Sequence, residues 1–142
     1  MIRVTVDVAV FTRHARGLEL LLVRRRNDPF AGEWALPGGF VDENEDLAPA
    51  AVRELEEETG IRLPEETPVN QLQAYGAPGR DPRGRTISIA FVALADDLPE
   101  PEAGDDAAEA RWWPAARLLG PDAPSYAFDH RTIVADAIRR MS

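Results

Sequence analysis

Three glutamates are spaced so that an α-helix would bring their carboxylates together. Glu54, Glu57 and Glu58 stand at positions i, i+3 and i+4, which share one helix face with Cβ atoms about 5–6 Å apart. Like charges at this spacing destabilise a helix and raise one another's pKa values. A hard cation such as Mg²⁺ removes that cost because it takes oxygen ligands at about 2.0–2.1 Å. The spacing alone fits two arrangements equally: a magnesium site, or a charged surface helix with Arg–Glu pairs.

Residues next to the triplet could complete a metal site. Arg53 could hold Glu45 or Glu56 in a bidentate ion pair and so orient the ligands. Gly38 and Gly39 let the backbone come close to a metal or a phosphate, and a glycine carbonyl can itself be a ligand. These neighbours favour the metal site over the plain charged helix.

The helix that carries the glutamates has clear ends. Asp46 can cap its N-terminus and Gly60 can terminate it. At 100° per residue, one side of this helix is apolar and should face a core; it comprises Ala48, Ala51, Val52, Leu55 and Thr59. One helix can therefore pack on one side and bind metal on another.

Strands and a second helix flank this segment. β-branched and apolar runs predict strands over Val4–Phe11, Leu18–Val23, Val69–Tyr75 and Thr86–Leu94, with shorter candidates at Trp34–Leu36 and Ala110–Trp113. Residues 37–39 (PGG) predict a turn, and residues 76–84 an Arg/Gly/Pro loop. A closing helix is predicted over Asp129–Met141, with an apolar stripe of Ile133, Val134, Ala137, Ile138 and Met141. The order of strands, helix, strands and helix is typical of an α+β or α/β/α layered domain.

The composition is that of one globular domain, residues 1–142. The net charge is −9, all 16 basic residues are arginine, and the absence of cysteine excludes disulfides, thiolate nucleophiles and zinc fingers. So acidic a chain should repel nucleic acid and anionic membranes. No apolar run approaches the ~20 residues of a membrane span, and the first residues do not resemble a signal peptide. We therefore expect a cytoplasmic protein.

The full pattern around the glutamates resembles a known family. Gly39, five residues, Glu45, seven residues and the run of residues 53–61 (RELEEETGI) match the Nudix box at every one of its defining positions. Residues 34–39 (WALPGG) also look like the family. The resemblance implies a Nudix fold, an α+β fold with a mixed β-sheet between helices in an α/β/α sandwich. It also implies hydrolysis of a nucleoside diphosphate linked to another moiety.

The resemblance also assigns roles by position. It implies Mg²⁺ as cofactor, with Mn²⁺ as an alternative, and the metal ligands Gly38 (through its carbonyl), Glu54, Glu57 and Glu58. Glu57 is alternatively the base, and Glu45 and Arg53 support the catalytic groups. Family members often add a general base from a loop before a late strand. Asp106, followed by Asp105 and Glu102, is our candidate, although plain solvated charge is the simpler interpretation of each.

Weaker signals concern the substrate. Pro78, some sixteen residues past the box, resembles the ADP-ribose pyrophosphatase branch, and so do residues 80–86 (RDPRGRT) and 127–130 (AFDH). Arg80, Arg83 and Arg85 are cations on a glycine-rich loop and suit a diphosphate or a ribose phosphate, unless the loop is an ordinary exposed turn.

Aromatic side chains and a second basic run give further candidates. Phe40, Tyr75 and Phe128 could stack on adenine, but core packing is the alternative and is favoured for Phe128. Residues 24–26 (RRR) are interpreted as a solvated strand end, with phosphate binding as the alternative. His14 and His130, the only histidines, do not lie in a triad-like context.

Three functions stay open from the sequence. The first is Mg²⁺-dependent hydrolysis of ADP-ribose to AMP and ribose 5-phosphate. The second is a Nudix hydrolase acting on nucleoside triphosphates, dinucleoside polyphosphates or NADH. The third is a non-catalytic ADP-ribose sensor, which the intact box, the net charge and the end of the sequence at Ser142 disfavour. A small-molecule nucleotide is the expected partner, and the family suggests a homodimer.

Overall fold

The computed structural model describes residues 1–104 and 106–141. Within these residues the elements, in chain order, are β1 (Arg3–His14), β2 (Gly17–Arg25), β3 (Trp34–Ala35), β4 (Gly38–Phe40), α1 (Leu47–Thr59), β5 (Asn70–Tyr75), β6 (Thr86–Leu94), β7 (Ala107–Pro114), the 3₁₀ turn η1 (Ala115–Arg117) and α2 (His130–Met141). No helix in this described part is long and apolar enough to cross a membrane.

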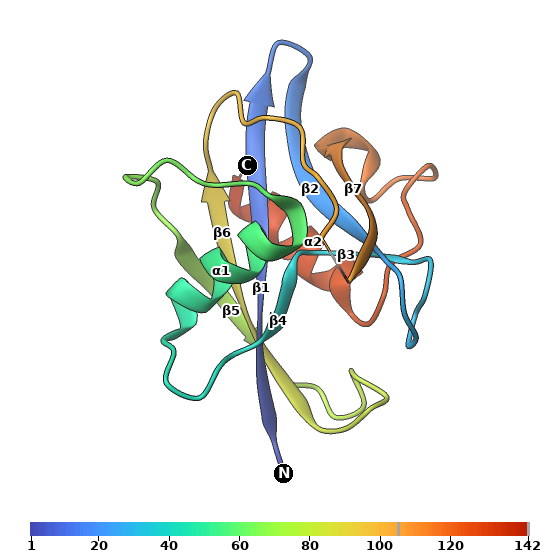
Figure 1. Cartoon of the computed structure of the whole chain (residues 1–142). Coiled ribbons are helices and arrows are strands. Elements are labelled where there is room, and N and C mark those ends of the chain that lie inside the picture. The colour runs from blue at the N-terminus through green and yellow to red at the C-terminus, as the bar shows by residue number, and fades with distance from the viewer. Residues whose placement is uncertain (105, 142) are drawn as a thin grey trace.

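Strand β1 is the centre of a mixed sheet (Figure 1). It pairs in parallel with β6 over nine residues, and β5 extends the sheet beyond β6 in antiparallel pairing. The other edge of β1 is divided: β4 pairs with Thr5–Asp7, whereas β2 pairs with Phe11–His14. Strands β2 and β4 therefore diverge beside the middle of β1, and β3 and β7 both pair with β2.

Successive residues of β1 point to opposite faces of the sheet, and each face is covered by one helix. Val6, Val8 and Val10 lie in a buried cluster with Ala51 and Leu55 of α1. Ala9 and Phe11 lie in a second cluster with Ile133, Val134 and Ala137 of α2. Figure 1 shows α1 on one face of the sheet and α2 on the other. The predicted α/β/α sandwich and the apolar stripe of the closing helix are confirmed.

Helix α1 has the predicted ends. The Asp46 carboxylate accepts a hydrogen bond from the Leu47 N–H at 2.7 Å, which satisfies one free donor of the first turn. Gly60 ends the helix with φ 71°, a left-handed conformation that favours glycine, and its N–H donates to the Glu56 carbonyl.

The buried face of α1 matches the predicted one except along one of its edges, where a different residue is buried. Val52 was expected in the core but is 37% exposed, whereas Ala50 is fully buried. Ala50, Glu54 and Glu58 stand at i, i+4 and i+8 and therefore form one row along the helix. The helix is rotated so that this row turns toward the sheet, which buries Ala50, brings the two glutamates close to β4 and exposes Val52.

Other differences are local. Residues 38–40 form strand β4, where the sequence predicted a turn, because Gly38 and Gly39 pair with Asp7 and Val6 of β1. Strand β7 begins at Ala107, three residues earlier than predicted. Phe128 precedes α2 and does not lie on it.

Substitutions on the two edges of α1 test this rotation. Leu55→Ala should lower the free energy of unfolding by about 2–5 kcal/mol because it leaves a cavity in the core. Val52→Ala, the matched control, should change it by less than about 0.5 kcal/mol because that side chain is partly in water. Chemical denaturation measures both values. Equal losses from the two variants would show that Val52 is packed as the sequence predicted.

Candidate functional site

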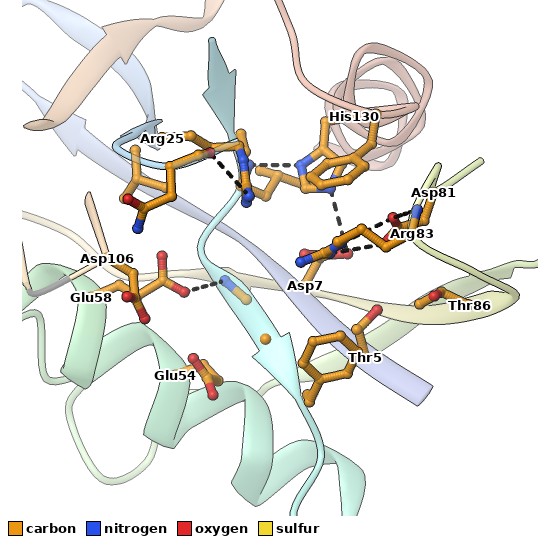
Figure 2. A pocket seen from close by; sticks show the side chains of 18 of the residues that line it. Thr5, Asp7, Arg25, Glu54, Glu58, Asp81, Arg83, Thr86, Asp106 and His130 are labelled. Carbon is orange, nitrogen blue, oxygen red and sulfur yellow. Dashed lines mark hydrogen bonds and ion pairs between the residues drawn. The ribbon is translucent and has the colours of Figure 1, made fainter. Parts of the chain in front are cut away.

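A cavity lies where β2 and β4 diverge beside β1. Its volume is about 470 Å³, and β1, β2, β4, α1, the loop before β6 and the segment before α2 all contribute to its wall. Figure 2 shows Glu54, Glu58 and Asp106 on one side and Asp81 and Arg83 on the opposite side. The cavity therefore has an acidic side and a side that carries arginines.

The acidic side depends on a close approach between α1 and β4. The Gly38 N–H donates to the Glu58 carboxylate at 3.1 Å. A Cβ atom on Gly39 would lie 2.6 Å from the Glu54 carboxyl carbon, so any larger residue there would displace that carboxylate. The glycines therefore let two carboxylates of one helix rest against the strand backbone.

Both carboxylates are held in an environment that disfavours their charged form. Burial is the main reason that the pKa of Glu58 is raised to about 8, and repulsion from Glu54, Asp7 and Asp106 adds to it. Burial also raises the pKa of Glu54, although the neighbouring Arg53 opposes that shift. Without a cation the acidic side is thus electrostatically strained.

Arg53 links the carboxylates around the acidic side of the cavity by hydrogen bonds. Its guanidinium donates to both Glu45 oxygens at 2.6 and 2.8 Å, to Glu54 at 2.9 Å and to Glu57 at 3.2 Å. Of the two partners that the sequence left open, the structure places Glu45 on Arg53, while Glu56 pairs with Arg62. The Glu57 side chain is 59% exposed and lies outside the cavity wall.

The loop before β7 brings Asp106 to the cavity. The Glu102 N–H donates to the Thr59 carbonyl and the Gly104 N–H to the Glu58 carbonyl, each at 2.8 Å, so the loop caps the last turn of α1. Asp106 lines the cavity, whereas Glu102 is exposed and does not. Asp105, the remaining candidate base, lies outside the described residues.

The predicted substrate arginines separate into two groups. Arg80 and Arg83 line the cavity. Arg85 is exposed, donates to the Gly76 carbonyl and does not line the cavity, and Pro78 is also exposed and outside it. The structure therefore brings two of these four residues to the site.

The three candidate aromatic residues also separate. Phe40, which is 38% exposed, and Phe128 both line the cavity. Phe128 has φ 51°, and a strained backbone of this kind in a bulky residue is found mostly at functional sites. Tyr75 is buried and donates a hydrogen bond to Asp136 of α2. Core packing describes Tyr75, and it describes Phe128 in part, because that ring packs against a small buried cluster while also lining the cavity.

Several lining residues were not identified from the sequence. Asp7 of β1 accepts a short hydrogen bond from the buried Ser88 hydroxyl, and His130 Nε2 lies 3.7 Å from Asp7. His130 Nδ1 accepts from the Leu36 N–H, and burial lowers the pKa of this histidine. Asp7 could have been identified from the sequence as a candidate site residue, because it is a lone acid within the apolar run of β1.

The acidic side fits a partly hydrated divalent cation. Among the described residues, no three His, Asp or Glu side chains already converge into a metal-binding group. Mg²⁺ does not need such a cage, since it usually keeps several waters and binds one or two carboxylates together with substrate phosphates. Two strained carboxylates, Glu54 and Glu58, at the wall of an open cavity meet that requirement.

The geometry agrees with a comparison to known families. Residues 1–137 match the NUDIX domain model. The chain belongs to the Nudix family. Divalent metals such as Mg²⁺ are general among Nudix hydrolases.

Three relatives place the chain within this family. It is 43% identical over 123 residues to the ADP-ribose pyrophosphatase of Methanocaldococcus jannaschii, covering 85% of this chain and 66% of the relative. It is 34% identical over 140 residues to an ADPR-responsive transcriptional repressor of Acinetobacter baylyi, covering 97% of this chain and 54% of the relative. The solved NUDIX domain of Shewanella oneidensis NrtR, complexed with ADP ribose, superposes with a TM-score of 0.89 at 34% identity, covering all of this chain and 90% of that one. The chain thus spans just under two thirds of the length of the Methanocaldococcus jannaschii relative and about half of the length of the Acinetobacter baylyi relative.

The raised pKa of Glu58 makes stability depend on pH. The native state holds this proton up to about pH 8, whereas the unfolded chain releases it near 4.5, so ionisation costs stability as pH rises between these values. Without divalent metal, Glu58→Gln should therefore melt at a higher temperature than the wild type at about pH 9. The two should melt alike below about pH 4.5, because Gln does not ionise and can still accept the Gly38 N–H bond.

Melting curves recorded in a metal chelator across this pH range provide the measurement. Glu66→Gln, at an exposed position, is the matched control and should follow the wild type throughout. A Glu58→Gln variant that is less stable than the wild type at high pH would refute the strained carboxylate.

Proposed function

We propose that this protein is a Nudix pyrophosphohydrolase that cleaves ADP-ribose to AMP and ribose 5-phosphate with Mg²⁺ as cofactor. One observation carries the proposal: a single cavity has a pair of strained carboxylates on one side and arginines with aromatic rings on the other. A nucleoside diphosphate derivative has matching parts, because its diphosphate can share a cation with the carboxylates while its other groups face the arginines and rings. One curated relative is named an ADP-ribose pyrophosphatase, the other is named as ADPR-responsive, and the solved NrtR domain is complexed with ADP ribose.

The metal would be held by Glu54 and Glu58, with the Gly38 carbonyl as a further ligand. Glu57, the other predicted ligand, lies outside the cavity wall and would have to leave Arg53 to join them. When bound, a divalent cation neutralises the diphosphate and makes a bound water nucleophilic. The protein's own residues supply the remaining functions. Arg53 keeps Glu54 and Glu57 in place through its hydrogen bonds, and Glu45 fixes Arg53 from the other side.

The proton of the attacking water needs an acceptor. Asp106 is our candidate base because it lines the cavity on the side of Glu58. Glu57 is the alternative; it is exposed and would have to leave Arg53 to reach the cavity. On the opposite side, Arg80, Arg83 and Phe40 are proposed to contact the substrate.

The substrate is tested with a panel. Purified protein with millimolar Mg²⁺ should hydrolyse ADP-ribose with a higher kcat/KM than nucleoside triphosphates, dinucleoside polyphosphates or NADH, and should release AMP. Chromatography of the products with time gives both values. If ADP-ribose stayed intact while another nucleotide was cleaved rapidly, the proposed substrate would be wrong. The protein would still be a hydrolase.

The metal site is tested at Gly39. Mg²⁺ should raise the melting temperature of the wild type, because a ligand that binds only the native state stabilises it. Gly39→Ala should abolish most of this rise, since its Cβ displaces the Glu54 carboxylate. Gly120→Ala is the matched control because nothing lies within 4 Å of its Cβ position. Equal rises in all three proteins would place the cation elsewhere.

A second candidate function is an ADP-ribose sensor. The observation in its favour is the similarity, along 97% of this chain, to a protein named as a transcriptional repressor. Tight ADP-ribose binding without turnover in any divalent metal would support it. The absence of nucleic-acid partners, the homodimer and the cytoplasmic location expected from the sequence stay predictions.

A further inference from the structure

Three arginines line the cavity, and two of them already have a carboxylate partner. Arg80 donates to both oxygens of Asp129 at 2.7 and 2.9 Å, and its side chain is only 5% exposed. Arg83 donates to both oxygens of the buried Asp81 at 2.8 and 3.1 Å. Each of these positive charges is therefore largely neutralised by the protein itself.

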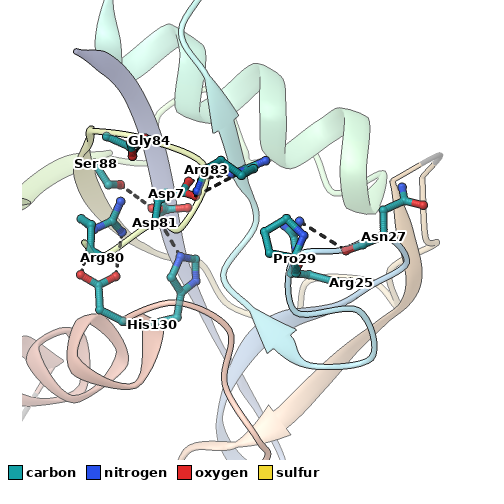
Figure 3. Close-up of polar contacts among 12 residues, drawn as sticks. Asp7, Arg25, Asn27, Pro29, Arg80, Asp81, Arg83, Gly84, Ser88 and His130 are labelled. Carbon is teal, nitrogen blue, oxygen red and sulfur yellow. Dashed lines mark hydrogen bonds and ion pairs between the residues drawn. The ribbon is translucent and has the colours of Figure 1, made fainter. Parts of the chain in front are cut away.

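Arg25, at the end of β2, is the exception. Its Nε–H donates to the Pro29 carbonyl at 2.8 Å, and an Nη–H reaches the Asn27 carbonyl at 3.5 Å. Both acceptors are neutral, and within residues 1–104 and 106–141 no carboxylate lies within 4 Å of this guanidinium. Figure 3 shows Arg25 beside Asn27 and Pro29, and Arg83 beside its partner Asp81.

The position of Arg25 is suited to a ligand that crosses the cavity. Its Cζ lies 4.9 Å from the ring centroid of Phe128, which restricts the guanidinium plane. Its charge interacts favourably with Glu58 and Asp106 on the acidic side and with Asp81 on the arginine side, and unfavourably with Arg83. Arg25 therefore faces both sides of the cavity. Burial lowers the pKa of Arg25, yet a guanidinium stays charged at neutral pH.

A partly buried charge that no carboxylate contacts directly is costly, and an anionic ligand in direct contact reduces that cost. Because two N–H groups of Arg25 are engaged by carbonyls, three of its five donors are left for a ligand, in the fork geometry that suits a phosphate. From the sequence, residues 24–26 are interpreted as a solvated strand end, with phosphate binding as the alternative. The two outer arginines of this run have partners of their own. Arg24 pairs with Glu109, and Arg26 donates to the Ala107 carbonyl.

We propose that Arg25 is the principal protein cation that binds the diphosphate of the nucleotide, between the metal-binding carboxylates and Arg83. This inference rests on the proposed function for the class of ligand, a nucleoside diphosphate, and holds whichever derivative is hydrolysed. The loop of residues 27–29 then has the role of orienting Arg25 through its carbonyls.

Binding of ADP, measured by calorimetry in a metal chelator, tests the proposal without requiring turnover. Arg25→Gln should weaken ADP binding about tenfold or more, the usual scale for a charge-assisted hydrogen bond. Arg25→Lys should recover part of this loss because it restores the charge. Arg24→Gln, a matched control one residue away, should bind ADP like the wild type. Adenosine, which lacks phosphates, should bind the wild type and Arg25→Gln equally.

The lysine variant separates anion binding from a merely structural role. Both Arg25→Gln and Arg25→Lys lose the planar fork that holds the Pro29 carbonyl, so a loop-anchoring role predicts equal losses in both. Equal losses, a parallel loss of adenosine binding, or no ADP binding by the wild type would each overturn the proposal. The two proposals can fail separately. If ADP-ribose stayed intact with magnesium but Arg25→Gln bound ADP more weakly than the wild type, the proposed substrate would be rejected. Arg25 would still be the residue that binds the diphosphate.

Discussion

The structure depends on the contact between the row of carboxylates on α1 and the backbone of β4. Glu54 and Glu58 are brought against Gly38 and Gly39, where burial opposes the ionisation of both, and repulsion from Glu54 adds to this at Glu58. A protein selected only for stability would place apolar side chains in this row. The rotation of α1, the exposure of Val52 and the glycine pair all follow from keeping acids there, which is the usual exchange of stability for function.

The arrangement of charge in the cavity is more informative than the net charge of the chain. A total of −9 suggests a surface that repels anions, yet the cavity places arginines opposite its acids. Most of these arginines are neutralised by Asp81 and Asp129, so the positive field is concentrated at one guanidinium. The divided edge of β1 makes this possible, since β2 supplies Arg25 and β4 supplies the glycines from strands that have separated.

The features that were predictable from sequence are those set by local spacing. The ends of α1, its glutamate row and the ion pairing of Arg53 with a nearby glutamate, left open between Glu45 and Glu56, depend on residues within one helix or its approach. Asp7, Ser88 and His130 could not be grouped in this way, because the parallel pairing of β1 with β6 joins segments 81 residues apart. The two interpretations of Arg25, a solvated strand end or a phosphate-binding group, could not be separated for a related reason: its orientation depends on carbonyls of the following loop, which the pattern of a strand end does not reveal.

The hydrogen bonds between the loop before β7 and the last turn of α1 have a mechanical consequence. The Glu102 and Gly104 amides attach this loop to the carbonyls of Thr59 and Glu58, so the segment that leads to Asp106 is tied to the helix that carries the glutamates. If the two walls of the cavity were to move apart to admit or release a ligand, the acids would travel together. Their mutual geometry would be preserved, and the arginine side of the cavity would move relative to them.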